Sequence, residues 1–386
     1  MAKFLFWISV AFVVYVYIGY PILLCALQFL FRASSRKQPV EPSISLLVAA
    51  YNEAAVIGEK IRNSLTLDYP AEKLQVVIAS DGSKDATADI VRSFSAAEPG
   101  RIRLFDFSKN RGKTQVLNDV IKELRSDIVA FSDSSSMLAP DSVRTLVQSF
   151  SDPRVGAASG VYRLLKQDQA RMGSQEDLYW KYETFLKVQE AKLGAFTGAH
   201  GSLYAIRREL YPFPSANTIN DDFTIPMRIL GRGYRVAYEP AAVAYEEAHE
   251  MEGFSRRVRI TAGNIEQLRE IKGLLWPPRP FALFCLLSHK TGRLLVPVFM
   301  IGALVANLVL LGQFPYNWLL LGQLIFYGLA ALGARMSLRP KVLRLPFYFC
   351  MINSALFAWV YQAVRHGRAI PSRIELDQLG NRPPIG

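Results

Sequence analysis

The chain has 386 residues, of which 51% are hydrophobic, and a formal net charge of +12. This length allows more than one domain, and the positive charge suggests nucleic acid or an anionic surface as a partner. The basic residues follow one long apolar run at Arg32, Arg36 and Lys37 and another at Arg335, Arg339, Lys341 and Arg344. Such flanks are typical of the cytoplasmic ends of membrane spans. The pattern therefore argues against nucleic acid and favours membrane lipids.

The first predicted element is an uncharged apolar stretch, residues 4–31, which is long enough to cross a bilayer. It lacks the short apolar core and the small-residue cleavage site of a signal peptide. Further spans are expected near 294–313, 318–334 and 345–363. The stretch 281–290 is too short to cross, so it is expected to lie along the membrane surface.

Basic flanks also orient the predicted spans. The flank after the first span places residues 32–275 in the cytoplasm, so the chain is expected to be a multi-pass protein of the inner (plasma) membrane. Segment 345–363 is left open. If it crosses, Arg365, Arg368 and Arg373 lie outside, so either it does not cross or the charge rule fails there.

Between these apolar ends, residues 39–275 alternate short apolar runs with helical patterns. Strands are expected at 43–50, 74–80, 102–107 and 127–133, and helices at 54–65, 86–94, 113–124 and 141–150. This βαβα order predicts an α/β domain whose mostly parallel sheet is covered on both faces.

Polar residues follow three of the predicted strands: Tyr51-Asn52-Glu53, Asp81-Gly82-Ser83 and Asp133. In an open α/β sheet such strand ends converge on the ligand crevice. Each alone also suits a turn or a helix cap, but together they indicate one site. An acid in the place of Asp133 often holds a metal together with a second acid, and here that second acid is missing.

Two later motifs carry further candidates. Segment 197–210, TGAHGSLYAIRREL, opens with glycines that allow close backbone approach to a ligand and ends in a basic run with a helical pattern. In segment 218–230, Asp221 and Asp222 are expected to begin a helix. These acids suit the positive end of the helix, and equally a division of labour in which one orients and the other acts as a base.

Residues 255–275 predict a basic amphipathic helix at the membrane surface. Its first arginines, including Arg256 and Arg259, are expected to face the crevice and to hold a diphosphate.

The motifs together resemble the membrane-integrated family 2 glycosyltransferases, to which cellulose, hyaluronan and poly-N-acetylglucosamine synthases belong. The resemblance covers roughly residues 40–275. It is carried by Tyr51-Asn52-Glu53, Asp81-Gly82-Ser83-Lys84-Asp85, Gly112-Lys113 with Leu117-Asn118, Phe131-Ser132-Asp133, Asn220-Asp221-Asp222 and Arg256-Arg257-Val258-Arg259.

This resemblance implies a glycosyltransferase A-type (GT-A) fold, which is Rossmann-like. The expected domains are an N-terminal span with its basic flank (1–38), the cytosolic glycosyltransferase domain (39–254), interfacial helices (255–293), and a C-terminal transmembrane region with a tail (294–386).

The resemblance also implies a nucleotide-sugar donor, usually a uridine diphosphate sugar, and Mg²⁺ or Mn²⁺ at Asp133. Asp222 matches the general base, and Asp221 is assigned an orienting role. The expected donor-binding residues are Tyr51, Glu53, Asp81, Lys113, Asp133, Arg256 and Arg259. The expected acceptor-binding residues are Gly198, His200 and Gly201.

Two departures from the family pattern stand out. Ser135 replaces the second metal-binding acid, and its hydroxyl is expected to bind a metal-held water, with His249 as a weaker candidate ligand. Ile260 replaces the tryptophan that helps place the acceptor sugar in processive synthases. The second departure favours short products.

We therefore expect an inverting glycosyltransferase that moves a sugar to a glycan or lipid-linked acceptor at the inner membrane, in surface or exported polysaccharide synthesis, with export machinery as a candidate partner. One alternative is a processive synthase that also translocates its polymer. Another is a non-catalytic nucleotide-sugar-binding receptor.

Overall fold

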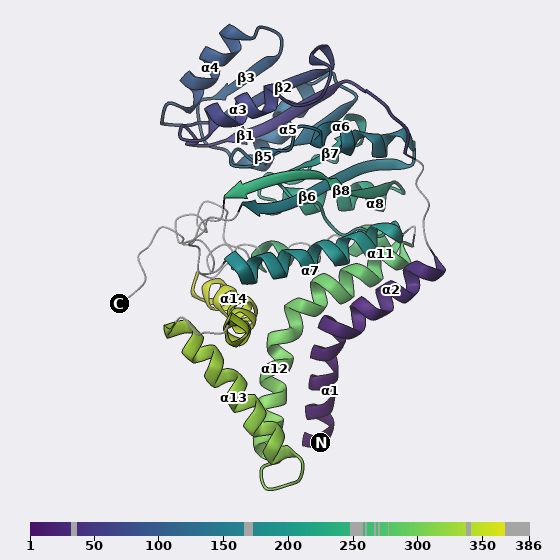
Figure 1. Ribbon diagram of the computed structural model, residues 1–386, viewed down its shortest axis with the longest axis vertical. Coiled ribbons are helices and arrows are strands. Elements are labelled where there is room, and N and C mark those ends of the chain that lie inside the picture. Colours follow the sequence, from purple (N-terminus) through teal and green to yellow (C-terminus); the bar gives the residue numbers. More distant parts are fainter. Residues whose placement is uncertain are drawn as a thin grey trace.

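The computed structural model describes residues 1–31, 37–165, 173–247, 258, 261–265, 268, 271–276, 278–336 and 341–366. A sheet with its covering helices forms one end of the molecule, and long apolar helices form the other (Figure 1). The helix α7 (Gly173–Lys192) lies between these two parts.

In the part of the chain that the structure describes, the sheet has eight strands in the order β3-β2-β1-β4-β7-β6-β8-β5. Their bounds are Ile44–Ala50 (β1), Leu74–Asp81 (β2), Ile102–Phe107 (β3), Ile128–Phe131 (β4), Met137–Leu138 (β5), Val155–Leu165 (β6), Tyr204–Arg207 (β7) and Arg235–Glu247 (β8). The first four strands in the spatial order are parallel, as predicted, whereas β7 runs antiparallel to both β4 and β6. The sheet is therefore mixed.

The central strand β1 shows why these runs form strands. Its successive residues Leu47 and Val48 are both buried, and they pack into different apolar clusters on the two faces of the sheet. Continuous apolar runs of this kind are typical of strands that are covered on both sides.

The helices that follow the strands cover the sheet. Their bounds are Ile57–Leu65 (α3), Thr87–Ala97 (α4), Lys113–Glu123 (α5), Ser142–Val147 (α6) and Asp221–Gly231 (α8). All four helices predicted between 54 and 150 are present, with ends that differ by a few residues. The segments β6 and α7 fall where the sequence analysis made no prediction.

The helical pattern predicted at the end of segment 197–210 is wrong. Residues Tyr204–Arg207 form the strand β7, and only Arg208–Leu210 make a short 3₁₀ turn. Tyr204, Ala205 and Ile206 are fully buried between β4 and β6. The backbone pairing and burial on both faces outweigh the local helical spacing.

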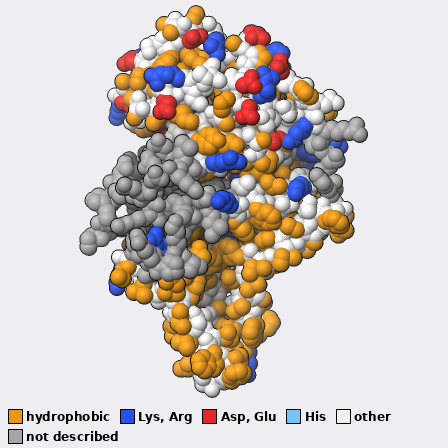
Figure 2. Space-filling view, viewed as in Figure 1, with side chains coloured by type: hydrophobic (Ala, Val, Ile, Leu, Met, Phe, Trp, Pro, Cys, Tyr) orange, Lys and Arg blue, Asp and Glu red, His pale blue; other side chains and the backbone are white. Residues whose placement is uncertain are grey.

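Within the described residues, three helices are long and apolar enough to cross a membrane: Ala2–Leu30, Pro280–Val309 and Tyr316–Arg335 (α13). The first comprises α1 (Ala2–Val14) and α2 (Tyr20–Leu30), joined by a π-helical turn at Tyr15–Gly19. The second comprises α11 (Pro280–Cys285) and α12 (Gly292–Val309), joined by a π-helical turn at Leu286–Thr291. In α14 (Leu345–His366), the apolar stretch Leu345–Tyr361 is shorter. Hydrophobic side chains dominate this tapering end, whereas charged side chains gather over the sheet domain (Figure 2).

The segment 281–290 is continuous with the next predicted span, and its position along the membrane surface stays a prediction. These residues begin a 30-residue helix that continues to Val309. His289 is buried because it meets polar partners on α7: its Nδ1 lies 2.6 Å from Glu190 Oε1, and its Nε2 lies 3.3 Å from Glu183 Oε1.

A buried carboxylate joins the apolar helices to the sheet domain. Glu190 of α7 accepts hydrogen bonds from Tyr20 Oη at 2.7 Å and from Thr197 Oγ1 at 2.9 Å, in addition to its contact with His289. We call Glu190 with Tyr20, His289 and Thr197 the Glu190 junction. It connects both long N-terminal and C-terminal helices to the loop that follows α7.

Candidate active site

The loop after β2 is organised by Asp81. Its two carboxylate oxygens each accept a backbone N–H at 2.8 Å, one from Arg111 and the other from Gly112. Gly82 has a φ of +70°, and a Cβ there would lie 2.5 Å from the backbone nitrogen of Asn110, so the loop packs directly on the strand end. Asp81 thus fixes the turn before α5, and its role in binding the donor stays a prediction.

The end of β1 carries the predicted Tyr51 and Glu53. The backbone N–H of Glu53 donates to Thr87 Oγ1 at 2.8 Å, while the Asn52 side chain accepts the Lys84 N–H at 2.8 Å. Tyr51 remains 44% exposed. Its side chain is therefore partly open to solvent, and binding of the donor by Tyr51 stays a prediction.

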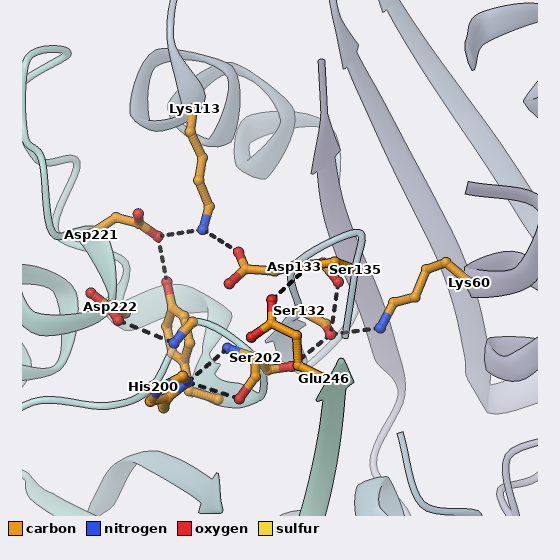
Figure 3. A network of polar contacts seen from close by, with 12 residues as sticks. Lys60, Lys113, Ser132, Asp133, Ser135, His200, Ser202, Asp221, Asp222 and Glu246 are labelled. Atoms are coloured by element: carbon orange, nitrogen blue, oxygen red, sulfur yellow. Dashed lines mark hydrogen bonds and ion pairs between the residues drawn. The ribbon is translucent and has the colours of Figure 1, made fainter. Parts of the chain in front are cut away.

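Lys113 brings three of the sequence motifs together. It is the first residue of α5, and its ammonium group lies 2.8 Å from Asp133 Oδ1 and 3.5 Å from Asp221 Oδ2 (Figure 3). Asp133 keeps 41% of its side chain exposed, whereas Asp221 keeps only 5%. The cation and the exposed carboxylate face the same space.

Asp221 and Asp222 differ in their surroundings although they are adjacent at the start of α8. Asp221 is buried and accepts a hydrogen bond from Tyr204 Oη at 3.3 Å, besides its contact with Lys113. Asp222 turns to the loop before β7, where its Oδ2 accepts the Gly201 N–H at 3.1 Å. The N-cap position of α8 belongs to Asn220, and no side chain makes a capping hydrogen bond there. This arrangement favours different roles for Asp221 and Asp222 over a role for either of them as a helix cap.

The environment of Asp222 suits a base that works near neutral pH. Burial, followed by the neighbouring charge of Asp221, raises the pKa of Asp222 to about 6. A catalytic base is most effective when its pKa lies close to the working pH.

Lys60 supports the loop that carries Asp133, and the sequence analysis missed it. This lysine of α3 is fully buried, and its ammonium group donates to Ser132 Oγ at 2.7 Å and to the Ser136 carbonyl. Ser132 Oγ in turn donates to the Ser202 carbonyl at 2.7 Å. The available signal was its spacing, because Lys60 shares the inward face of α3 with Ile57 and Ile61.

Ser135 forms a hydrogen bond with a second residue that the sequence analysis missed. Its Oγ donates to Glu246 Oε1 of β8 at 2.8 Å. Figure 3 shows the Glu246 carboxylate beside Asp133 and Ser135. A second acid thus reaches the Asp133 loop from a distant strand rather than from position 135.

Comparisons with known proteins are consistent with this geometry. The sequence profile described as "Glycosyltransferase like family 2" matches residues 42–262. The chain belongs to glycosyltransferase family 2. This confirms the resemblance and the enzyme class predicted from the motifs.

Two curated relatives of this glycosyltransferase are poly-beta-1,6-N-acetyl-D-glucosamine synthases. That of Staphylococcus aureus (strain COL) is 28% identical over 231 residues, which are 58% of this chain and 55% of the relative. That of Staphylococcus epidermidis is 26% identical over 245 residues, 62% of this chain and 58% of the relative. The chain thus matches little more than half the length of these relatives.

A solved structure confirms the GT-A fold. The mannosyltransferase PcManGT of Pyrobaculum calidifontis, in complex with GDP-Man and Mn²⁺, superposes with a TM-score of 0.71 at 24% identity. The match covers 93% of this glycosyltransferase and 99% of the mannosyltransferase.

The predicted acceptor residues of the glycosyltransferase line the space beside Asp222. The His200 ring stacks on Tyr162 with centroids 4.5 Å apart, and its Nδ1 lies 2.9 Å from Ser202 Oγ. Gly198 has a φ of +91°, and a Cβ there would lie 2.6 Å from the Phe223 ring. Both positions therefore shape the loop that contacts Asp222.

Several predicted residues lie outside the described part of the chain: Arg256, Arg257, Arg259, Ile260 and His249. Within the expected amphipathic helix 255–275, the helix α10 (Ile271–Leu275) is present. Tyr204, which could have offered a ring to the acceptor in place of the tryptophan absent at 260, is fully buried and stacks on Phe131 at 4.6 Å. It is therefore not available to a sugar.

Replacing Gly201 with alanine is expected to lower the transfer rate by about 10–100-fold, because an error of about 1 Å in a catalytic group can cost 10²-fold. A Cβ at Gly201 would lie 2.8 Å from Asp133 Oδ2 and would push this carboxylate aside. Steady-state kinetics of Gly201→Ala should be compared with Gly322→Ala, since Gly322 has no heavy atom within 4 Å of the added carbon. Equal activity of the two variants would contradict the role given to Asp133.

The thermal stability of the wild type is expected to rise between pH 7 and 9 relative to Lys60→Met. Burial lowers the pKa of Lys60 from 10.5 to about 7, so between these values the unfolded chain binds more protons than the folded one. Stability must then increase with pH in this window, and a methionine removes that contribution. Tm measured in one detergent at pH 7 and pH 9 tests this. Parallel shifts in both proteins would show that burial does not lower the pKa of Lys60.

Proposed function

We propose that this glycosyltransferase is an inverting enzyme that moves a sugar from a nucleotide sugar to a hydroxyl of a glycan or lipid-linked acceptor. The observation that carries the proposal is the position of Lys113 between Asp133 and Asp221, with Asp222 next along α8. A cation and an exposed carboxylate suited to a diphosphate thus lie beside a candidate base.

In the proposed reaction, an acceptor hydroxyl attacks the anomeric carbon from the side opposite the diphosphate. The new bond joins the acceptor oxygen to the anomeric carbon, and the bond from that carbon to the diphosphate breaks. Asp222 accepts the hydroxyl proton. Lys113 stabilises the negative charge that develops on the leaving diphosphate, while Asp221 holds Lys113 and the start of α8 in place.

The residues around Asp133 fit a hard divalent cation. Asp133 exposes 41% of its side chain, and the missing Cβ of Gly201 leaves its Oδ2 uncovered. Mg²⁺ or Mn²⁺ takes carboxylate, water and phosphate oxygens, so one or two protein carboxylates suffice. Such an ion, when bound, would supply positive charge to the diphosphate. Asp133 would hold it, and Glu246 would lie close by.

A UDP sugar is the proposed donor, and UDP-N-acetylglucosamine is the first to test, because the curated relatives are named poly-N-acetylglucosamine synthases. The apolar helices support a place in the inner membrane. The basic flanks support a cytoplasmic catalytic domain. Synthesis of a surface or exported polysaccharide, with export machinery as a partner, completes the proposal.

A processive synthase is the second candidate, and the names of the curated relatives favour it. The expectation of short products rests on Ile260, which lies outside the described residues. Excess donor with limiting acceptor separates the two candidates. An even spread of short products supports distributive transfer, whereas long chains beside untouched acceptor support processivity.

The overall test is release of nucleoside diphosphate by the purified protein in detergent, from a panel of nucleotide sugars. Release that depends on an acceptor supports the proposal. Tight donor binding without release from any donor would instead indicate the non-catalytic receptor.

A further inference from the structure

The loop between α7 and β7 contacts the candidate base at two points. The backbone carbonyl of Asp222 accepts the Ala199 N–H at 2.9 Å, and its Oδ2 accepts the Gly201 N–H at 3.1 Å. Figure 3 shows the Asp222 carboxylate directed at the part of this loop that carries His200. The position of the base therefore depends on what holds residues 197–201 in place.

Glu190, near the end of α7, holds this loop. Its Oε2 accepts the Thr197 hydroxyl at 2.9 Å, and the Thr197 N–H donates to the same oxygen at 3.4 Å. The Glu190 backbone carbonyl also accepts the Ala195 N–H at 3.0 Å. Glu190 is fully buried and Thr197 is only 1% exposed, so solvent does not replace these hydrogen bonds when one of them is lost.

The other carboxylate oxygen of Glu190 is held by the apolar helices. Its Oε1 accepts the Tyr20 hydroxyl at 2.7 Å and lies 2.6 Å from His289 Nδ1. Tyr20 begins α2 of the first long apolar helix, and His289 belongs to the helix Pro280–Val309. Figure 1 shows α7 between these helices and the sheet. One carboxylate thus joins the membrane side of the molecule to the loop beside the base.

Lys187 adds an electrostatic connection between the two acids. It lies three residues before Glu190 on α7, on the same side of the helix, and is 7% exposed. Burial, and then the charge of Lys290, lowers the pKa of Lys187 to about 8, while the charges of Asp222 and Glu190 oppose this shift. The same cation therefore acts on both carboxylates.

We propose that Glu190 is a positioning residue for the transfer reaction: fixed by Tyr20 and His289, it holds the loop 197–201 against Asp222. This inference rests on the proposed function, because it assigns a support to the proposed base. A base must lie within hydrogen-bond reach of the proton that it takes. An error of about 1 Å in the position of a catalytic group can cost about 10²-fold in rate. A loosened loop should therefore slow transfer while the donor still binds.

A purely stabilising role for Glu190 would give different results. Loss of a stabilising contact lowers Tm and leaves the rate of the folded enzyme intact. Loss of a positioning contact lowers kcat of the folded enzyme. It also weakens the hydrogen bond from the Gly201 N–H to Asp222, and such a bond favours the ionised form of a carboxylate. The pH profile of the reaction therefore reports on the loop.

The test compares Thr197→Val with Thr197→Ser, in the full chain in detergent. Valine removes the hydroxyl that binds Glu190, whereas serine retains it. Thr197→Val should lower kcat by about 10–100-fold, with donor affinity close to that of the wild type. Thr197→Ser should keep most of the wild-type rate.

The pH profile of kcat/KM is measured on the same proteins. In Thr197→Val its apparent pKa should lie above the wild-type value by about one pH unit, because the ionised form of Asp222 loses a hydrogen bond. Four other charged residues act on Asp222 and are unchanged in both variants: Asp221, Lys113, Asp133 and Lys187. A difference between the valine and serine variants therefore comes from the loop.

A second pair of variants tests the membrane side of the junction. Tyr20→Phe removes one hydrogen bond to Glu190 and leaves His289 in place, so kcat should fall by about 2–10-fold. Tyr69→Phe is the matched control. Tyr69 is also buried, and its hydroxyl donates to the Pro42 carbonyl at 2.7 Å between α3 and β2. This variant should keep the wild-type kcat.

Three results would overturn the proposal. The first is a wild-type kcat in a folded Thr197→Val protein. The second is a fall in its kcat with an unchanged pH profile. The third is an equal kcat in Tyr20→Phe and Tyr69→Phe, which decides the question if Thr197→Val fails to fold.

Asp222→Asn, measured alongside, keeps this inference distinct from the proposed function. If Asp222→Asn loses transfer while Thr197→Val does not, the role of Glu190 is wrong and the proposed base stands. If Asp222→Asn retains transfer, the base assigned in the proposed function is wrong.

Discussion

Replacing Asp222 with asparagine is expected to lower transfer by about 10²–10⁴-fold, which is the usual contribution of a general base. Donor binding should change little, because Asp222 contacts the acceptor-side loop through Gly201 rather than the Lys113–Asp133 pair. Turnover and donor affinity, measured on the same preparation, test both statements. Near-normal turnover would remove Asp222 from the role of base.

The pH dependence gives an independent readout. In the wild type, kcat/KM should rise with pH through an apparent pKa near 6, because Asp222 accepts a proton only when it is ionised. The residual activity of Asp222→Asn should lack this rise. Below this pKa the wild type should therefore lose its advantage over the variant.

Two controls separate chemistry from folding. Asp221→Asn should cost less than Asp222→Asn, because Asp221 orients Lys113 and does not take the proton. In addition, the raised pKa of Asp222 means that its ionisation opposes folding as pH rises through about 6. Asp222→Asn should thus unfold at a higher Tm than the wild type at pH 8. A lower Tm would show that the aspartate has a structural role.

Replacing Asp133 with alanine is expected to lower transfer by about 10²–10³-fold, as for the loss of one preorganised group that stabilises transition-state charge. Here the loss should include donor affinity, since Asp133 and its ion-pair partner Lys113 are proposed to bind the diphosphate together. Chelation of divalent ions in the wild type should reproduce most of the effect. Added Mn²⁺ should restore the wild type but not the variant.

A matched variant is Ser135→Ala. It removes the hydrogen bond to Glu246 but leaves the Asp133 carboxylate. The variant should therefore still need the metal ion, and it should bind that ion less tightly than the wild type does. Indifference of the wild type to chelators would refute the metal site. Asp133 would then serve as a partner of Lys113 alone.

Local sequence patterns predicted much of the parallel half of the sheet. Runs such as residues 74–80 are mostly apolar, and burial on both faces leaves a strand as the simplest solution. The prediction that the acids at the ends of these runs belong to one site rests on the same pattern, because parallel strands bring their carboxyl ends to one edge. The β7 strand escaped the analysis because its pairing with β4 and β6 is a tertiary effect.

The residues that the sequence analysis missed near Asp133 were missed for the same physical reason. Lys60 reaches the Asp133 loop through space from α3, and Glu246 reaches Ser135 from β8, 111 residues later in the chain. No local motif records such contacts. His289 lies near the end of the apolar stretch 281–290, and a polar residue there suggested a position at the membrane surface. In the structure His289 is instead paired with Glu183 and Glu190 of α7. The spacing of Lys60 was the available signal, because this polar residue shares the inward face of α3 with apolar residues.

The Glu190 junction bears on how this enzyme can be produced and recombined. A fragment that contains only residues 40–275 would lack Tyr20 and His289, which are partners of Glu190. It would also lack the apolar helices that cover Glu190 in the full chain. Such a fragment is a poor choice for crystallisation or assay. For the same reason, a chimera that borrows its anchor helices from a relative must carry over a tyrosine and a histidine at these two positions, or the graft will disturb the loop that faces Asp222.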